Sequence, residues 1–139
     1  MPDLIWEIDD EDGVFLTFDD GPTPGVTEWI LSTLDKYDAK ATFFVLGKNA
    51  EMYPDLYKRI LDAGHKVGNH TYSHQKGWGM SLERYTEDVD FANDLIHSEL
   101  FRPPYARITP AQARFLGQRY KPVSYTHLRA HETKAKLVC

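Results

Sequence analysis

Short apolar runs alternate with amphipathic segments along most of this chain, and this alternation restricts its fold more than any other feature. Val14–Phe18 and Ala41–Leu46 are nearly continuous apolar runs, as expected of strands covered on both faces. Shorter candidate strands follow at Lys66–Asn69, Leu100–Arg102 and Tyr120–Val123. Strands that alternate with helical segments are typical of βα units on a parallel sheet. The pattern therefore predicts an α/β fold.

The segments between these strands carry apolar residues at helical spacing, which predicts helices with one buried face each. Thr23-Pro24 is predicted to open the first helix and Gly64 to close the second. Thr109–Gln112 matches a capping box with proline at the first helical position, which predicts a further helix. The predicted core stripes are Val26, Ile30, Leu34 and Tyr37; Tyr53, Leu56, Tyr57, Ile60 and Leu61; and Leu82, Tyr85, Val89, Ala92 and Ile96.

The spacing of the strands limits how much of a barrel this chain can form. The predicted strands begin about 26 residues apart, so an eight-unit barrel would need roughly 210 residues. The chain has 139 residues, enough for about five units, so a barrel would be truncated at its C-terminal side. We expect residues 1–123 to form the domain. Residues 124–139 show neither strand alternation nor an apolar stripe, and we expect a non-native or unstructured tail, with a short native tail as the alternative.

The charge balance excludes several classes of partner. With 16 Lys+Arg and 21 Asp+Glu the net charge is −5, which argues against nucleic acid or an anionic membrane as the main partner. No apolar run approaches the ~20 residues of a membrane span, and Met1–Ile8 has acids where a signal peptide needs bases. A cytoplasmic location is the default expectation. The single cysteine, Cys139, excludes an internal disulfide and a multi-cysteine zinc cluster.

Two adjacent carboxylates, Asp19 and Asp20, follow the first predicted strand within the segment Thr17–Pro22. Neighbouring side chains at a strand end cannot share one direction, so one carboxylate can face a metal while the other faces an attacking water. The alternative is an Asp-rich turn before Gly-Pro with no chemical role.

A pair of histidines, His70 and His74, follows the third predicted strand four residues apart. This spacing lets both imidazoles converge on one ion, although two surface histidines are the alternative. Together with Asp20 they make the two-histidine, one-carboxylate set that holds a divalent metal and leaves positions open. Because thiolates are absent, zinc is favoured, and cobalt, nickel or iron also suit these donors.

A third cluster, Phe101–Tyr105, places the permanently charged Arg102 beside a stiff diproline turn. In isolation the favoured interpretation of this segment is a plain strand-to-loop turn with a surface arginine. If the strand ends meet, an arginine near Asp19 would keep that carboxylate ionised and oriented.

These motifs, FDDGP, HTYSH and RPPY in that order, resemble the polysaccharide deacetylase (NodB homology) domain of carbohydrate esterase family four. The resemblance covers about Val14 to Val123 and implies a distorted (β/α) barrel. It also implies metal-dependent removal of acetyl groups from an acetylated carbohydrate, commonly N-acetylglucosamine in chitin, chito-oligosaccharides or peptidoglycan, and sometimes acetylated xylan.

The resemblance also implies roles for individual residues. Asp19 corresponds to the catalytic base, Arg102 to the residue that tethers the base, and Tyr105 to the position whose backbone N–H binds the oxyanion. The implied metal ligands are Asp20, His70 and His74, and Thr71 takes the position that shapes the histidine loop.

The general acid is the one family element that we do not identify in this sequence. The family takes it from a late L-x-x-H motif, and Leu128–His131 matches those letters. His131 lies only 26 residues after Tyr105 and within the suspect tail, so we assign it no role.

Three functional hypotheses follow. The first is a metal-dependent polysaccharide or chito-oligosaccharide N-deacetylase, incomplete in this chain. The second is a non-catalytic protein that binds metal and sugar. The third is a related amidohydrolase that acts on a small N-acyl or ureide substrate. The oligomeric state is not predicted.

Overall fold

The computed structural model describes residues 15–123 of the chain. Its five strands form one sheet in the order β1-β2-β3-β4-β5, and every neighbouring pair is parallel. In chain order the elements are β1 (Leu16–Asp19), α1 (Val26–Lys36), β2 (Ala41–Val45), α2 (Gly47–Met52), α3 (Pro54–Asp62), β3 (Lys66–Asn69), α4 (Leu82–Ile96), β4 (Leu100–Phe101), the short 3₁₀ helix η1 (Pro104–Ala106), α5 (Pro110–Leu116) and β5 (Lys121–Pro122).

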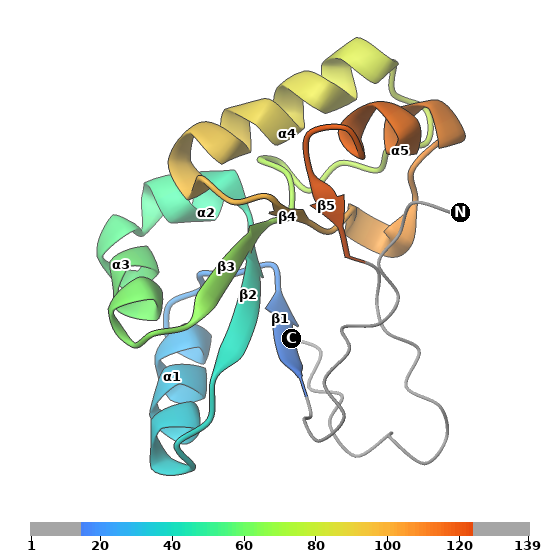
Figure 1. Cartoon of the computed structure of the whole chain (residues 1–139). Coiled ribbons are helices and arrows are strands. Elements are labelled where there is room, and N and C mark those ends of the chain that lie inside the picture. Colours follow the sequence, from blue (N-terminus) through green and yellow to red (C-terminus); the bar gives the residue numbers. More distant parts are fainter. Residues whose placement is uncertain (1–14, 124–139) are drawn as a thin grey trace.

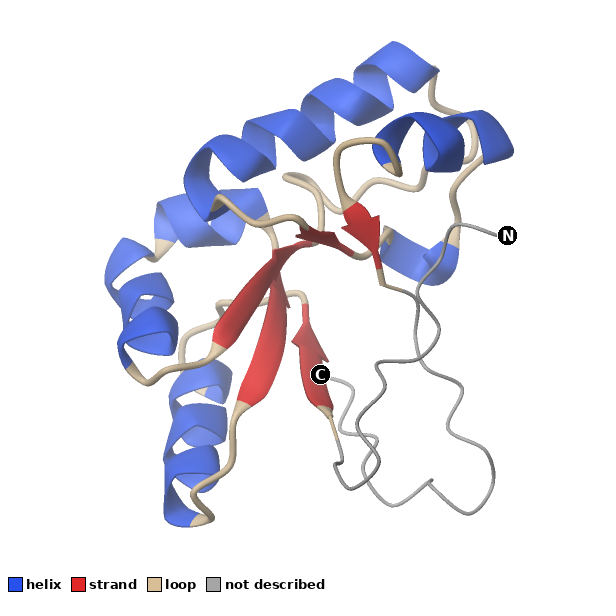
Figure 2. Cartoon of the chain, viewed as in Figure 1, coloured by secondary structure: helices blue, strands red, loops and turns tan. Residues whose placement is uncertain are grey.

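The sheet curls as part of a barrel does, and the helices follow its outer side (Figures 1 and 2). Strands β2 and β3 lie between β1 and β4, so β1 and β4 would be about 14 Å apart in a flat sheet. Arg102, directly after β4, nevertheless donates to Asp19 at the end of β1 across 2.7 Å. The curvature therefore brings the carboxyl ends of distant strands together on the inner side.

Two apolar clusters hold the helices against the sheet. The first joins β1, β2 and β3 to α1, α3 and α4, with Phe43 and Ile60 among its buried members. The second joins α4, α5 and β4, and in it Tyr85, Val89 and Phe101 are fully buried. None of the helices in residues 15–123 combines the length and apolar character needed to cross a membrane.

The predicted α/β class with parallel strands is confirmed, as is the length of the third strand. The other strands differ by one to two residues at their ends, and Val14 lies outside the described residues. The expectation for residues 124–139 also falls outside the described part of the chain. The capping box at Thr109 is present, with its hydroxyl accepting from the Gln112 N–H.

The predicted start of the first helix is wrong. Helix α1 begins at Val26, because Gly25 has a φ of 86° that only glycine adopts easily and that interrupts the helix after Pro24. The ends of two predicted core stripes are also exposed: Val26 and Tyr37 on α1, and Leu61 on α3. Val26 is the first residue of α1 and Tyr37 directly follows its last, whereas Leu61 follows the fully buried Ile60 and lies on another side of α3.

Two short elements, α2 and η1, were not predicted. Helix α2 has six residues, too few to show a helical period, and it is fixed by tertiary contacts. The Gly47 N–H donates to Thr71 O, and the Asn49 side chain donates to Asp20 O. These contacts join α2 to the loops that follow β1 and β3, the strands on either side of β2. Helix α2 therefore supports the edge of the sheet that is described next.

Candidate metal and catalytic site

The two adjacent carboxylates diverge at the end of β1. Asp19 is the last residue of the strand, and its side chain is 6% exposed. Asp20 adopts a left-handed backbone with a φ of 73°, and its side chain is 51% exposed. Aspartate tolerates this conformation better than most residues. The turn therefore directs one carboxylate inward and the other toward the histidines.

Asp20, His70 and His74 converge as the spacing predicted. Asp20 Oδ1 lies 3.3 Å from His70 Nε2 and 3.0 Å from His74 Nε2. One potential ligand atom from each residue lies within 4.8 Å of the other two. Contact with His70, the largest cause, and the charge of both imidazoles hold the pKa of Asp20 below its usual value, although partial burial opposes them. Asp20 is therefore an anion at neutral pH and suits a cation.

The orientation of His70 leaves one ring nitrogen directed at this cluster. His70 Nδ1 lies 2.6 Å from the carbonyl oxygen of Arg102, which can only accept, so Nδ1 carries the proton and donates. Nε2 is then a lone-pair acceptor, fully buried, with no hydrogen-bond donor among the described residues. It faces a carboxylate oxygen, and this contact is favourable only with a positive charge between the two atoms, either a proton on the ring or a metal cation. The residues present thus fit a divalent metal. In many metal sites a ligand histidine likewise donates its other ring N–H to a carbonyl oxygen.

Asp19 is held apart from that cluster by Arg102. The guanidinium donates from Nη1 to Asp19 Oδ1 at 2.7 Å and to Thr17 Oγ1 at 3.0 Å, and it lies 4.0 Å above the Phe44 ring. Both side chains are almost completely buried. Asp19 Oδ2 is buried and accepts no hydrogen bond within the described region. One carboxylate oxygen is thus fixed and the other remains able to accept a proton.

Thr71 and Asn69 shape the loop between the histidines. Thr71 Oγ1 accepts from the His74 N–H at 3.0 Å, and Asn69 Oδ1 accepts from the Thr71 N–H at 2.8 Å. Both side chains are fully buried. The sequence indicated Thr71 but not Asn69, whose role depends on its second bond, from Nδ2 to Val89 O on α4.

Tyr105 lies beside His74 at the rim of the cluster. Their rings are 4.8 Å apart, and the Tyr105 ring is half exposed. Its backbone is left-handed, with a φ of 60°, inside the diproline turn that follows Arg102. Nearby, Trp78 is 59% exposed and donates from Nε1 to Ile108 O, so it combines an exposed ring face with an anchored edge.

The other two histidines of residues 15–123 lie away from the cluster. His65 precedes β3 at the opposite end of the strand, where Nδ1 accepts from the Ala41 N–H. His97 is exposed and ends α4. His131 lies outside the described residues, so the structure adds nothing on the L-x-x-H segment.

The family model for polysaccharide deacetylases matches residues 7–120. The chain belongs to the polysaccharide deacetylase family. The family is metal-dependent, and the Asp20, His70 and His74 cluster is where this polysaccharide deacetylase domain could hold the metal.

Individual relatives give the same assignment. A peptidoglycan-N-acetylglucosamine deacetylase of Bacillus cereus is 41% identical over 118 residues, which covers 76% of this chain and 41% of the relative. The solved structure of the Bc1960 peptidoglycan N-acetylglucosamine deacetylase is 36% identical, with a TM-score of 0.76 over 78% of this chain and 54% of that one. A family 4 acetyl xylan esterase from Clostridium thermocellum, in complex with a cobalt ion, is 34% identical, with a TM-score of 0.66 over 70% of this chain and 51% of that one. This polysaccharide deacetylase chain thus spans about half the length, or less, of the relatives it matches.

Proposed function

We propose that this chain carries the metal site and base of a metal-dependent polysaccharide N-deacetylase that hydrolyses the acetamide of N-acetylglucosamine-type sugars. The observation that carries the proposal is the separation of the two carboxylates. Asp20 lies with His70 and His74, whereas Asp19 is held beside them by Arg102. Metal binding and proton transfer thus fall to neighbouring but distinct side chains.

Asp20, His70 and His74 would hold the cation. Two imidazoles and one carboxylate favour zinc, and cobalt, nickel or iron also suit them. A divalent metal at such a site supplies Lewis-acid polarisation of the acetyl carbonyl and activates water near neutral pH. The relative that was solved with cobalt supports a divalent metal in this family.

Asp19 would act as the general base. Within residues 15–123 its Oδ2 atom accepts no hydrogen bond, and its Oδ1 atom is fixed by Arg102, which orients the carboxylate. The proton of the attacking water would go to Oδ2. Tyr105 would stabilise the oxyanion through its backbone N–H, a contribution of about 3 to 4 kcal/mol for a well-aimed donor.

The rim of the site would bind the sugar chain. The exposed rings of Tyr105 and Trp78 each lie near a cation, with Lys76 Nζ 4.9 Å from the first ring and the Arg107 guanidinium 5.3 Å from the second. Aromatic faces suit sugar rings, and the two cations suit acidic substituents. We therefore propose a peptidoglycan strand, which carries carboxylates, ahead of neutral chitin.

A specific observation favours a second candidate, a non-catalytic metal- and sugar-binding protein. The departing amine needs a proton, and within residues 15–123 neither remaining histidine, His65 or His97, lies near enough to give it. A protein with these residues alone would bind metal and sugar but turn over amides slowly.

An activated ester tests the metal site and base that the two candidates share, and hydrolysis of sugar amides, which needs the proton donor, then separates them. The leaving group of 4-nitrophenyl acetate needs no proton, so the metal site and Asp19 should suffice to hydrolyse it. With added zinc we expect acetate release that a chelator abolishes and that Asp19→Asn lowers at least 100-fold. Release that is unchanged by both would rule out the deacetylase proposal. Parallel assays on peptidoglycan fragments and chito-oligosaccharides would then show which sugar amides are hydrolysed.

A further inference from the structure

The loop that carries the second histidine holds two strained residues. Thr71 and His74 both have left-handed backbones, with φ angles of 69° and 60°. Such a conformation is unfavourable for residues other than glycine. It persists only where surrounding contacts fix it, so the contacts of residues 71–74 decide where His74 lies.

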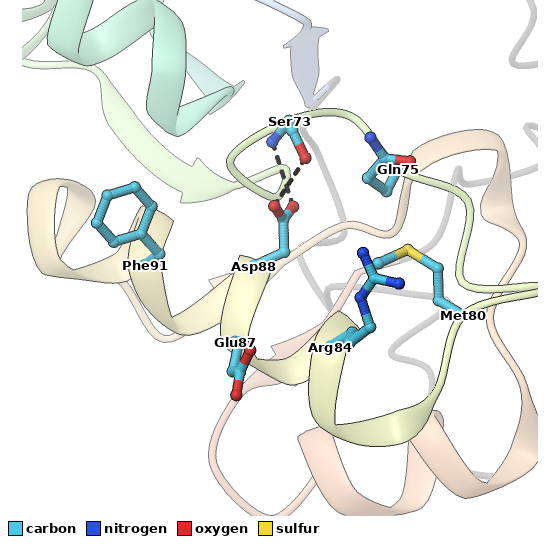
Figure 3. Close-up of a pocket in the computed structure, with 7 residues that line it drawn as sticks. All are labelled: Ser73, Gln75, Met80, Arg84, Glu87, Asp88 and Phe91. Atoms are coloured by element: carbon cyan, nitrogen blue, oxygen red, sulfur yellow. Dashed lines mark hydrogen bonds between the residues drawn. The ribbon is translucent and has the colours of Figure 1, made fainter.

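Side chains accept all four backbone N–H groups of this loop. Asn69 accepts from Thr71, and Thr71 accepts from His74. Asp88 Oδ2 accepts from both remaining amides, those of Tyr72 at 3.1 Å and Ser73 at 3.2 Å. Asp88 Oδ1 accepts from the Ser73 hydroxyl at 2.7 Å (Figure 3). Asn69 ends β3 just before the loop, so among these acceptors only Asp88, on α4, is distant in the sequence.

Asp88 stands on a rigid support and faces an open region. Its neighbours on α4, Tyr85, Val89 and Ala92, are fully buried. On the other side, Ser73 and Asp88 help line a hollow of about 660 Å³. Figure 3 draws these two residues with the others that line it. Helix α2 holds the carbonyl side of this loop, with the N–H groups of Gly47 and Lys48 donating to Thr71 O and Tyr72 O, and the Tyr72 ring packs on Phe91 of α4. The three bonds to the Asp88 carboxylate, stronger than bonds between neutral groups, are the hydrogen bonds that tie residues 71–74 to α4.

The two histidines depend on this loop to different degrees. His70 is fully buried, its N–H donates to Val45 O and its Nδ1 donates to Arg102 O. His74 has a quarter of its side chain exposed, and within residues 15–123 the one hydrogen bond of its backbone goes to Thr71. Movement of the loop would therefore displace His74 and leave His70 in place.

We propose that Asp88 is a positioning residue of the metal site, which fixes residues 71–74 so that His74 can share a divalent cation with Asp20 and His70. The proposal rests on the proposed function only in taking these three residues as ligands. It assigns Asp88 no contact with metal or substrate.

The test measures zinc affinity by calorimetry on the full chain. Asp88→Ala should weaken zinc binding about 10- to 100-fold, as loss of a residue that orients a ligand does. Asp90→Ala is the matched control. It removes a carboxylate from the same helix that also accepts three bonds, from Arg119 and Tyr120, and it should change zinc affinity less than about 2-fold.

A double variant gives the readout that a merely structural role would not move. In a His74→Ala background, Asp88→Ala should weaken zinc binding by less than about 2-fold, because the ligand it positions is absent. Asp88→Asn keeps one acceptor and should lie between wild type and Asp88→Ala. Equal zinc affinity of Asp88→Ala and Asp90→Ala, or a full Asp88 effect without His74, would overturn the proposal.

Amide hydrogen exchange in the metal-free protein tests Asp88 independently of the metal. The Tyr72 and Ser73 amides should exchange faster in Asp88→Ala and Asp88→Asn, and at the wild-type rate in Asp90→Ala. Unchanged exchange in the Asp88 variants contradicts the inference. If the wild-type chain binds no zinc, the metal site is wrong, and exchange still decides whether Asp88 holds the loop.

Discussion

His65 and His70 lie at the two ends of the same strand, β3, and both are buried, yet their imidazoles meet different surroundings. At the amino end, His65 Nδ1 accepts from the Ala41 N–H, and the nearest charge is the cation of Lys40. At the carboxyl end, His70 Nδ1 donates to Arg102 O, and Nε2 faces the Asp20 carboxylate. The first ring joins two strands; the second presents a lone pair to an anion.

The difference shows that burial does not identify a functional histidine. What matters is the group that faces its second nitrogen. In parallel α/β sheets the loops at the carboxyl ends collect such groups, because every strand delivers its following loop to the same edge. Here that edge holds the two carboxylates, His70, His74 and the buried Arg102, whereas at the amino edge His65 meets a backbone N–H and the exposed Lys40.

The largest expected effect comes from removing the buried cation at the carboxyl edge. Arg102→Ala leaves Asp19 buried and unpaired, so we expect the free energy of unfolding to fall by about 3 to 5 kcal/mol. At the amino edge, exposed Lys40 donates to Ala63 O, and Lys40→Ala should cost less than about 0.5 kcal/mol. Urea unfolding of both variants measures the difference. Similar losses for the two would show that the edges do not differ in buried charge.

The second prediction compares the two histidines directly. His70→Ala should weaken zinc binding more than about 100-fold, beyond the effect of losing a residue that only supports a ligand. His65→Ala removes a ring of similar burial at the other end of β3 and should leave zinc affinity within about 2-fold, while lowering stability. Calorimetric titration with zinc measures both. A large loss of affinity in His65→Ala would contradict the separation of the two ends.

The smallest expected effect is on pH dependence at the amino end. Burial, and secondarily the charge of Lys40, lowers the pKa of His65 below its usual 6.5. Between the two values the unfolded chain binds more protons than the folded one, so stability falls as the pH falls through 6.5. His65→Gln does not titrate and should lose less stability between pH 7 and pH 5. Denaturation of both metal-free proteins tests this; equal losses would contradict it.

Sequence patterns predicted what depends on local order. The apolar runs located the strands, and the rule that parallel strand ends share an edge correctly predicted that Asp20, His70 and His74 come together. Contacts between segments far apart in the sequence could not be predicted from such local patterns. Asp88 reaches its loop from 15 and 16 residues away, and α2 owes its place to bonds with the loops after β1 and β3.

The errors in the helices have a related cause. A helical period shows which residues share a face, but not how far the sheet extends beneath them. Val26 and Tyr37 continue the stripe of α1 beyond its contact with the sheet and are exposed. The start of α1 depends on the left-handed backbone of Gly25, which the nearby proline obscured.

The central claim is best tested by a crystal structure of the zinc- or cobalt-loaded protein with anomalous diffraction. The account predicts a single ion about 2.0 to 2.2 Å from Asp20, His70 Nε2 and His74 Nε2, with Asp19 still bound to Arg102 and not coordinated. An ion held by other side chains, or none in this cluster at saturating metal, would contradict it.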